Sequence, residues 1–193
     1  MAWKAVLFDM DGVLIDSEEY MAKTGVRALK KYGIDAKESD FAEFVGCGEN
    51  RYVGGVAGEK WGTMTACYAT GNVTLEINSP QDLSGGGVVG LNGGSTVLAC
   101  YATGNVNSKG SNTGNVHIGG FLGDNYTTVT ACYWKNNHEQ GIGYNRESTK
   151  VTKVDGSVVT WQKAVDAMNT ALQNAGSKWR YELKGALPTL RKQ

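Results

Sequence analysis

The sequence predicts a mainly β protein: a β-solenoid of about three repeats with a C-terminal α/β cap, preceded by a partial α/β fragment that is mostly helical. A motif that recurs three times is the first observation behind this prediction. The second is composition, because 27 Gly and only 2 Pro among 193 residues are typical of short strands joined by turns. The third is a change of composition along the chain, which divides it into residues 1–53, 54–145 and 146–193.

Two sequence strings recur along the chain and define the repeat. The string TACYATGNV at 65–73 returns as LACYATGNV at 98–106, and TACYW follows at 130–134. A Gly-Gly-x-x-Gly string precedes each copy, starting at Gly54, Gly86 and Gly119. One such unit cannot bury its inner face alone, whereas stacked units share a continuous core. The repeat therefore predicts the solenoid over residues 54–145.

Side-chain alternation within the repeat predicts two faces. Cys67 and Tyr68 are neighbours in an extended segment, so they should point to opposite faces, and we expect the cysteine inside. The three repeated cysteines are Cys67, Cys100 and Cys132. We expect buried thiols there. Metal binding and disulfide formation remain alternatives, although residues from separate repeats do not resemble the Cys-x-x-Cys pair of a zinc site.

The outer face carries an aromatic row. Its members are Tyr68, Tyr101, Tyr133 and Trp134. These rings either stabilise the stacking of one repeat on the next or form a platform that binds a glycan or a protein. Both interpretations stay open from the sequence alone.

A different motif opens the chain. The string AVLFDMDG at 5–12 is an apolar run that ends in Asp9 and Asp11. Such a run predicts a buried parallel strand, and the carboxyl end of such a strand is where open α/β sheets place ligands. Two carboxylates at that position could share a Mg²⁺ ion. The longer string FDMDGVLIDSE at 8–18 is more specific than the Asp pair.

This string resembles motif I of the haloacid dehalogenase superfamily, in the branch of β-phosphoglucomutase-like phosphatases. The resemblance implies that Asp9 is the nucleophile that forms an aspartyl-phosphate. It implies that Asp11 is the general acid/base and binds Mg²⁺ through its carbonyl. The likeness covers about residues 3–62 and includes the start of a helical cap, with a helix expected over 18–32 between Ser17 and Gly33.

The remaining motifs of that family are missing. VVT at 158–160 and FLGDN at 121–125 imitate the hydroxyl and acidic motifs, but their order is reversed, and GDN aligns with GLN of the preceding repeat. Without these groups the charge that develops in phosphoryl transfer lacks stabilisation. We therefore regard Asp9 and Asp11 as vestigial and expect no cofactor, with Mg²⁺ the exception if the motif functions. The alternative is a Mg²⁺-dependent phosphohydrolase or phosphoglucomutase-like enzyme with Asp9 as nucleophile.

Residues 54–193 resemble the GLUG-motif repeat proteins of bacterial surfaces, including adhesins of the Bacteroides type. That resemblance implies a non-catalytic, adhesin-like structural or binding module. The string GGVAGEKWG at 54–62 fits both resemblances, so the chain has the pattern of two parents joined there. The leading hypothesis is a non-catalytic repeat protein fused to an incomplete phosphatase fragment.

The tail predicts a helix and a strand. Thr160 suits a helix N-cap, Gly176 suits the end of the helix, and KWRYEL at 178–183 alternates like a strand. An apolar stripe at helical spacing marks the buried face: Trp161, Ala164, Val165, Met168 and Leu172. We expect this tail to cap the C-terminal end of the repeats.

Charge and hydropathy limit the partners. Lys plus Arg and Asp plus Glu are both 19, so the formal net charge is zero, which does not favour nucleic acid. No apolar run is long enough for a membrane span, and Val6–Phe8 is too short for a signal-peptide core. The sequence predicts a cytoplasmic protein, although the repeat family is typically found at the cell surface. A glycan or a protein, bound through the face of the repeats, is the expected partner.

Overall fold

The computed structural model describes Lys37 and residues 50–77, 82–110 and 114–193. Within these, Tyr52–Gln193 form one compact unit. Asp9, Asp11 and the helix predicted over 18–32 lie outside the described residues. The fold below is that of the compact unit.

Short strands account for most of this unit, and they recur in the same order. The first set is β1 (Asn50–Gly54), β2 (Ala57–Lys60), β3 (Met64–Thr65), β4 (Tyr68–Ala69) and β5 (Val73–Ile77). The second is β6 (Asp82–Gly86), β7 (Val89–Asn92), β8 (Val97–Leu98), β9 (Tyr101–Ala102) and β10 (Val106–Gly110). The third is β11 (Val116–Gly119), β12 (Leu122–Asn125), β13 (Val129–Thr130) and β14 (Tyr133–Trp134). The chain then continues through β15 (Ile142–Asn145), β16 (Thr152–Lys153), α2 (Trp161–Asn174), β17 (Trp179–Glu182) and β18 (Thr189–Lys192).

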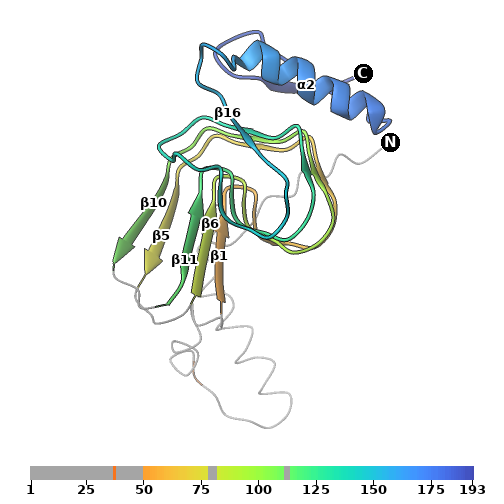
Figure 1. The fold of residues 1–193 in the computed structure, drawn as a ribbon. Coiled ribbons are helices and arrows are strands. Elements are labelled where there is room, and N and C mark those ends of the chain that lie inside the picture. Colours follow the sequence, from red (N-terminus) through yellow and green to blue (C-terminus); the bar gives the residue numbers. More distant parts are fainter. Residues whose placement is uncertain (1–36, 38–49, 78–81, 111–113) are drawn as a thin grey trace. The chain divides into compact units, whose positions relative to one another are not determined.

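Each strand pairs with its counterpart in the next set. The sheets have the orders β1-β6-β11, β10-β5, β15-β12-β7-β2, β13-β8-β3 and β16-β14-β9-β4, and β17 and β18 form a separate antiparallel pair. Figure 1 shows β1, β6 and β11 side by side, with β5 and β10 next to them. Tyr68, for example, lies opposite Tyr101, which lies opposite Tyr133. Equivalent residues of successive repeats therefore form rows across the sheets.

A left-handed alanine sits at the same corner of each repeat. Ala66, Ala99 and Ala131 have φ values of 54°, 52° and 49°. This conformation costs a non-glycine residue about 1–2 kcal/mol, and the small alanine side chain tolerates it better than a branched one. The corner splits the segment that the sequence presents as one alternating strand, so β3 ends at Thr65 and β4 begins at Tyr68.

The described core has two main apolar clusters, and Ala66 and Ala99 of this corner belong to one of them. One cluster contains Cys100 and Cys132 with Val97, Phe121 and other aliphatic residues. The other contains Tyr101 and Tyr133 together with residues of α2. Adjacent cysteines and tyrosines therefore do face opposite sides, as the alternation predicts.

The predicted helix is confirmed. The Thr160 hydroxyl accepts a hydrogen bond from the Lys163 N–H at 3.3 Å, and α2 begins at the next residue. Gly176 follows the helix with a φ of 66°. The residues that α2 buries are the predicted stripe: Trp161, Ala164, Val165, Met168 and Leu172. The predicted strand at 178–183 corresponds to β17.

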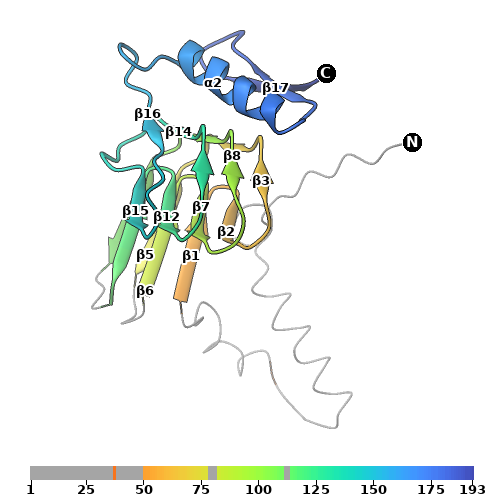
Figure 2. The ribbon, with the colours of Figure 1, turned by 45° about the vertical axis from the view of Figure 1, so that its right-hand side comes forward.

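The fold class predicted from the sequence is wrong. The described chain is a mostly β protein of parallel sheets with a single helix, rather than a three-repeat solenoid closed by a C-terminal cap. The helix shares an apolar cluster with Ala66, Ala99 and Tyr133, one residue from each repeat. It therefore lies along the side of the repeats instead of covering their end, as Figure 2 shows. Helical periodicity identifies which residues α2 buries, but it carries no information on which surface receives them.

Candidate functional site

The predicted aromatic row does not form an exposed platform. Tyr68 and Tyr101 stack with ring centroids 5.0 Å apart and planes 2° apart. Tyr68 is 40% exposed, but Tyr101 is fully buried and meets Trp161 of α2 edge-on. Tyr133 is also buried. The expectation that these tyrosines point to solvent is corrected for Tyr101 and Tyr133, because the tail covers them.

Trp134, the last member of the predicted row, lies in the other apolar cluster. Its indole N–H donates to the carbonyl of His138 at 3.1 Å. The structure therefore brings Tyr68, Tyr101 and Tyr133 together and leaves Trp134 apart from them. A ligand that approaches this face meets the ring of Tyr68.

The repeated cysteines form a hydrogen-bonded row of thiols. The Cys67 N–H donates to the Cys100 sulfur at 3.3 Å, and the Cys100 N–H donates to the Cys132 sulfur at 3.4 Å. All three are free thiols, and burial raises the pKa of Cys100 well above its ordinary value. The hydrogen bond to Cys100, followed by burial, raises the pKa of Cys67. Among the described residues, no group of three or more His, Cys, Asp and Glu side chains could hold a metal ion.

A polar cluster that sequence reasoning missed lies around Asp124. One carboxylate oxygen, Oδ2, accepts a hydrogen bond from the Ser84 hydroxyl at 2.7 Å. The other, Oδ1, lies 2.7 Å from Nδ1 of His117. Ser84 and Asp124 are buried, whereas the His117 side chain is about one-third exposed. Oδ1 is buried and accepts no hydrogen bond within the described chain, so its contact with His117 is the short approach of Nδ1, and Nε2 is the nitrogen turned away from Asp124.

Strand register places these residues. His117 of β11 lies opposite Ser84 of β6, and Asp124 of β12 lies opposite Leu91 of β7 on one side and Tyr144 of β15 on the other. Leu91 is buried at the position where the next repeat has Asp124. The first repeat has the exposed Glu59 at this position, so stacking accepts an acidic, an apolar or an aromatic residue there. Burying a carboxylate, as at Asp124, is costly even when it is paired. The fold itself does not require Asp124, which makes the cluster a candidate functional site.

Three rings and a guanidinium continue the site along the surface. His117 and Tyr144 stack with centroids 4.9 Å apart and planes 18° apart. Tyr126 lies 6.1 Å from Tyr144, and the Arg146 guanidinium carbon lies 5.8 Å from the centre of the Tyr126 ring. Tyr126 and Tyr144 are exposed. We call these residues, with the polar pair beneath them, the Tyr126–Tyr144 site: Ser84, His117, Asp124, Tyr126, Tyr144 and Arg146.

The electrostatics keep the phenol of Tyr126 neutral. Burial, and after it the nearby Asp124 carboxylate, raises the pKa of Tyr126 above its ordinary value. The hydroxyl can therefore donate as well as accept a hydrogen bond at neutral pH. No described carboxylate forms an ion pair with Arg146. The site thus presents two phenols, one imidazole nitrogen and one guanidinium.

A signal for this site was present in the sequence. GDN at 123–125 aligns with GLN at 90–92, so Asp124 stands where the preceding repeat has Leu91. A charged residue at the buried position of a repeat is informative because stacking alone favours an apolar one. The position of His117 beside Asp124 depends on the packing of β11 against β12, which the repeat pattern does not define.

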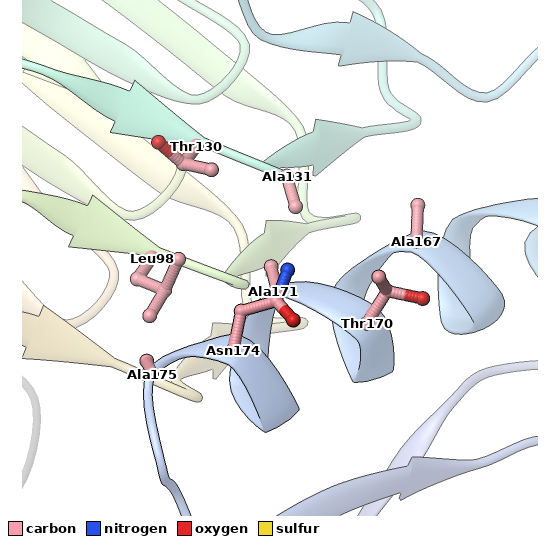
Figure 3. Close-up of a pocket in the computed structure, with 8 residues that line it drawn as sticks. All are labelled: Leu98, Thr130, Ala131, Ala167, Thr170, Ala171, Asn174 and Ala175. Carbon is pink, nitrogen blue, oxygen red and sulfur yellow. The ribbon is translucent and has the colours of Figure 1, made fainter.

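An apolar groove lies between the helix and the repeats. It has a volume of about 570 Å³ and is lined mainly by alanines and threonines, as Figure 3 shows. Its lining residues are Leu98, Thr130, Ala131, Ala167, Thr170, Ala171, Asn174 and Ala175. No titratable side chain lines this groove, so it offers packing and no acid–base chemistry.

The two strings that imitate phosphatase motifs have structural partners. Asp124 of FLGDN belongs to the cluster described above, and Asn125 donates to the Asn145 side chain at 2.8 Å. Thr160 of VVT is the N-cap of α2. The structure places these two strings in unlike elements, a strand of the third repeat and the start of the helix.

Comparison with known proteins finds one family and one relative. Residues 6–75 match the family model of the haloacid dehalogenase-like hydrolases. Protein SUPPRESSOR OF QUENCHING 1, chloroplastic, from Arabidopsis thaliana is 45% identical over 56 residues, which are 29% of this chain and 5% of that protein. This chain therefore spans only a small part of the length of that relative. No solved structure matches the chain.

The family match supports the resemblance of the N-terminal segment to haloacid dehalogenase-like hydrolases. It also corrects one expectation. The match reaches residue 75, and residues 50–75, which are its described part apart from Lys37, consist of strands and turns rather than helix. The comparisons give no support to the resemblance to GLUG-motif adhesins. No helix among the described residues is long and apolar enough to cross a membrane.

Proposed function

We propose that the compact unit of residues 52–193 is a non-catalytic binding module that takes carbohydrate at the Tyr126–Tyr144 site. The observation that carries this proposal is the Ser84–Asp124–His117 cluster beside the exposed rings of Tyr126 and Tyr144. Phenol rings pack against the C–H faces of sugar rings, and fixed polar groups bind sugar hydroxyls.

The cluster supports binding because it fixes a donor and acceptor set on rigid strands. Ser84 donates its hydroxyl to Oδ2 of Asp124, and Oδ1 lies 2.7 Å from Nδ1 of His117. His117 in turn stacks on Tyr144. Groups that are already held in place lose little conformational entropy when a ligand binds.

Electrophoresis through gels that contain soluble polysaccharides tests this proposal. The chain should be retarded by at least one polysaccharide of a panel that includes neutral and acidic members. Tyr144→Ala should abolish the retardation. Tyr68→Ala is the matched control, because the two tyrosines are 42% and 40% exposed and Tyr68 lies outside the site. A chain that migrates freely in every gel, or two variants that behave alike, would exclude this function.

A second candidate function follows from the family match at residues 6–75. It is a Mg²⁺-dependent phosphohydrolase in which Asp9 is the nucleophile and Asp11 the general acid/base. Such a site is complete only if the chain also supplies the cap residues and three further groups of the family: a Ser or Thr hydroxyl, a lysine and an acidic pair. The match ends before 158–160 and 121–125, the two strings that imitate those motifs.

Enzyme assays separate the two candidates. We expect p-nitrophenyl phosphate and sugar phosphates to be hydrolysed at the background rate with Mg²⁺, and Asp9→Asn to change nothing. The loss of one preorganised group that stabilises charge typically lowers the rate about 10²–10³-fold, and several are missing. Mg²⁺-dependent turnover that Asp9→Asn removes would establish the phosphohydrolase instead.

A further inference from the structure

Arg146 gives the Tyr126–Tyr144 site a preference that its rings alone would not have. The guanidinium carbon lies 5.8 Å from the centre of the Tyr126 ring, a distance at which a cation is attracted by the ring face. The Arg146 backbone N–H donates to the Asn125 carbonyl at 2.9 Å, which anchors the residue at the end of β15. Its charged group is therefore held beside the phenols.

The charge of Arg146 is available to a ligand. The ion pairs of the described chain are formed by other residues, and none of them involves Arg146. The carboxylate of Asp124, beside the rings, is buried; it accepts a hydrogen bond from Ser84 and faces Nδ1 of His117 rather than pairing with Arg146. A planar guanidinium binds a carboxylate through two parallel N–H donors, and stacking on an aromatic ring leaves these edge donors free.

We infer that the ligand of this site is an acidic glycan whose uronate carboxylate is bound by Arg146 while its sugar rings contact Tyr126 and Tyr144. This inference rests on the proposed function and deepens it. Nε2 of His117 and the neutral phenol of Tyr126 are the groups that meet the sugar hydroxyls. Lipids and phosphorylated ligands fit less well, because the site offers one cation beside two rings rather than a cluster of cations.

Two trisaccharides that differ only in charge test the inference. One is α-1,4-linked trigalacturonate, and the other is its methyl ester. Isothermal titration calorimetry of the full chain should show at least tenfold tighter binding of the acid than of the ester in 20 mM salt. Raising the salt to 150 mM should weaken the binding of the acid, because screening acts on the exposed ion pair.

Variants assign the preference to Arg146. Arg146→Gln should lower the affinity for the acid to that for the ester and leave the affinity for the ester unchanged. Lys150→Gln is the control, because it removes one exposed positive charge four residues away and should change neither affinity more than about twofold. Circular dichroism spectra that match the parent would show that both variants are folded.

The outcomes distinguish the inference from the proposed function. Equal binding of acid and ester, or an Arg146→Gln variant that keeps the preference, overturns the inference, while retardation in neutral polysaccharide gels would still support a carbohydrate-binding module. Failure of both trisaccharides to bind also overturns the inference. Free migration in every polysaccharide gel removes the proposed function itself.

Discussion

Tyr68 and Tyr101 show how much one register position can differ between repeats. They stack on each other and occupy equivalent strands, yet Tyr68 is 40% exposed and Tyr101 is fully buried. Tyr101 also donates its hydroxyl to the Pro188 carbonyl and meets Tyr181 edge-on. Its contacts come from the tail, which no local pattern around residue 101 reveals.

We therefore expect different costs for the same substitution. Tyr101→Ala should lower the free energy of unfolding by about 3–5 kcal/mol, the range for removing a buried aromatic side chain. Tyr68→Ala should cost less than half as much, because part of that side chain is already in water. Urea denaturation followed by circular dichroism measures both. Equal effects would show that the tail does not cover Tyr101.

The cysteines were predicted more fully than the tyrosines. Cys100 and Cys132 are buried and Cys67 is partly buried. This placement follows from alternation and from recurrence at one position, and both are visible in the sequence. Asp124 was missed as a site residue because its importance depends on Ser84 and His117, which reach it from other strands. Local patterns define which face a residue occupies, whereas a cluster of side chains depends on how separate strands pack.

The helix α2 illustrates the same division at the scale of an element. Its start, its end and its buried stripe follow from Thr160, Gly176 and helical periodicity. Its partner surface includes Ala66 and Ala99 together with Tyr101 and Tyr133, two of the tyrosines that alternation places on the outer face. The residues of the helix were thus predicted correctly, but its position was not, because it packs along the side of the repeats rather than over their C-terminal end.

The packing of α2 on that row makes it a major contributor to stability. Met168 is fully buried against the tyrosine side of the repeats, so Met168→Ala should lower the free energy of unfolding by about 2–5 kcal/mol. Gln173 lies on the exposed side of the same helix, so Gln173→Ala should change the free energy of unfolding by less than about 0.5 kcal/mol. Thermal melting of both variants measures the difference. A small effect of Met168→Ala would argue against the side-on packing.

At the scale of the whole molecule, the repeats and the tail should not need the N-terminal segment. Tyr52–Gln193 form one compact unit, and β1 begins at Asn50. A chain of residues 50–193 should therefore give a β-type circular dichroism spectrum and one cooperative melting transition. An insoluble product, or a chain that melts without cooperativity, would show that residues before 50 are part of the folding unit.

The sequence reveals the repeat, its period and the change of character near residue 54, because each rests on identities between nearby segments. The arrangement of the whole is harder to predict. Parallel pairing of equivalent strands was within reach, but the side-on tail and the Tyr126–Tyr144 site arise from contacts between segments that share no pattern. Such contacts carry no periodic signal, so inspection of one sequence cannot find them.

The tail has a consequence for how the chain assembles. The Tyr181 hydroxyl donates to the Ala99 carbonyl at 2.9 Å and lies 3.2 Å from the Cys67 carbonyl, 114 residues earlier in the chain. Contacts between neighbouring repeats close loops of 33 residues. Because loop-closure entropy grows only with the logarithm of length, the longer closure costs roughly 1 kcal/mol more than the shorter one. A segment at the end of the chain can thus link the first repeat to the second at small entropic cost. Because this contact is so distant in sequence, we expect it to slow folding more than its closure entropy lowers the stability of the folded state.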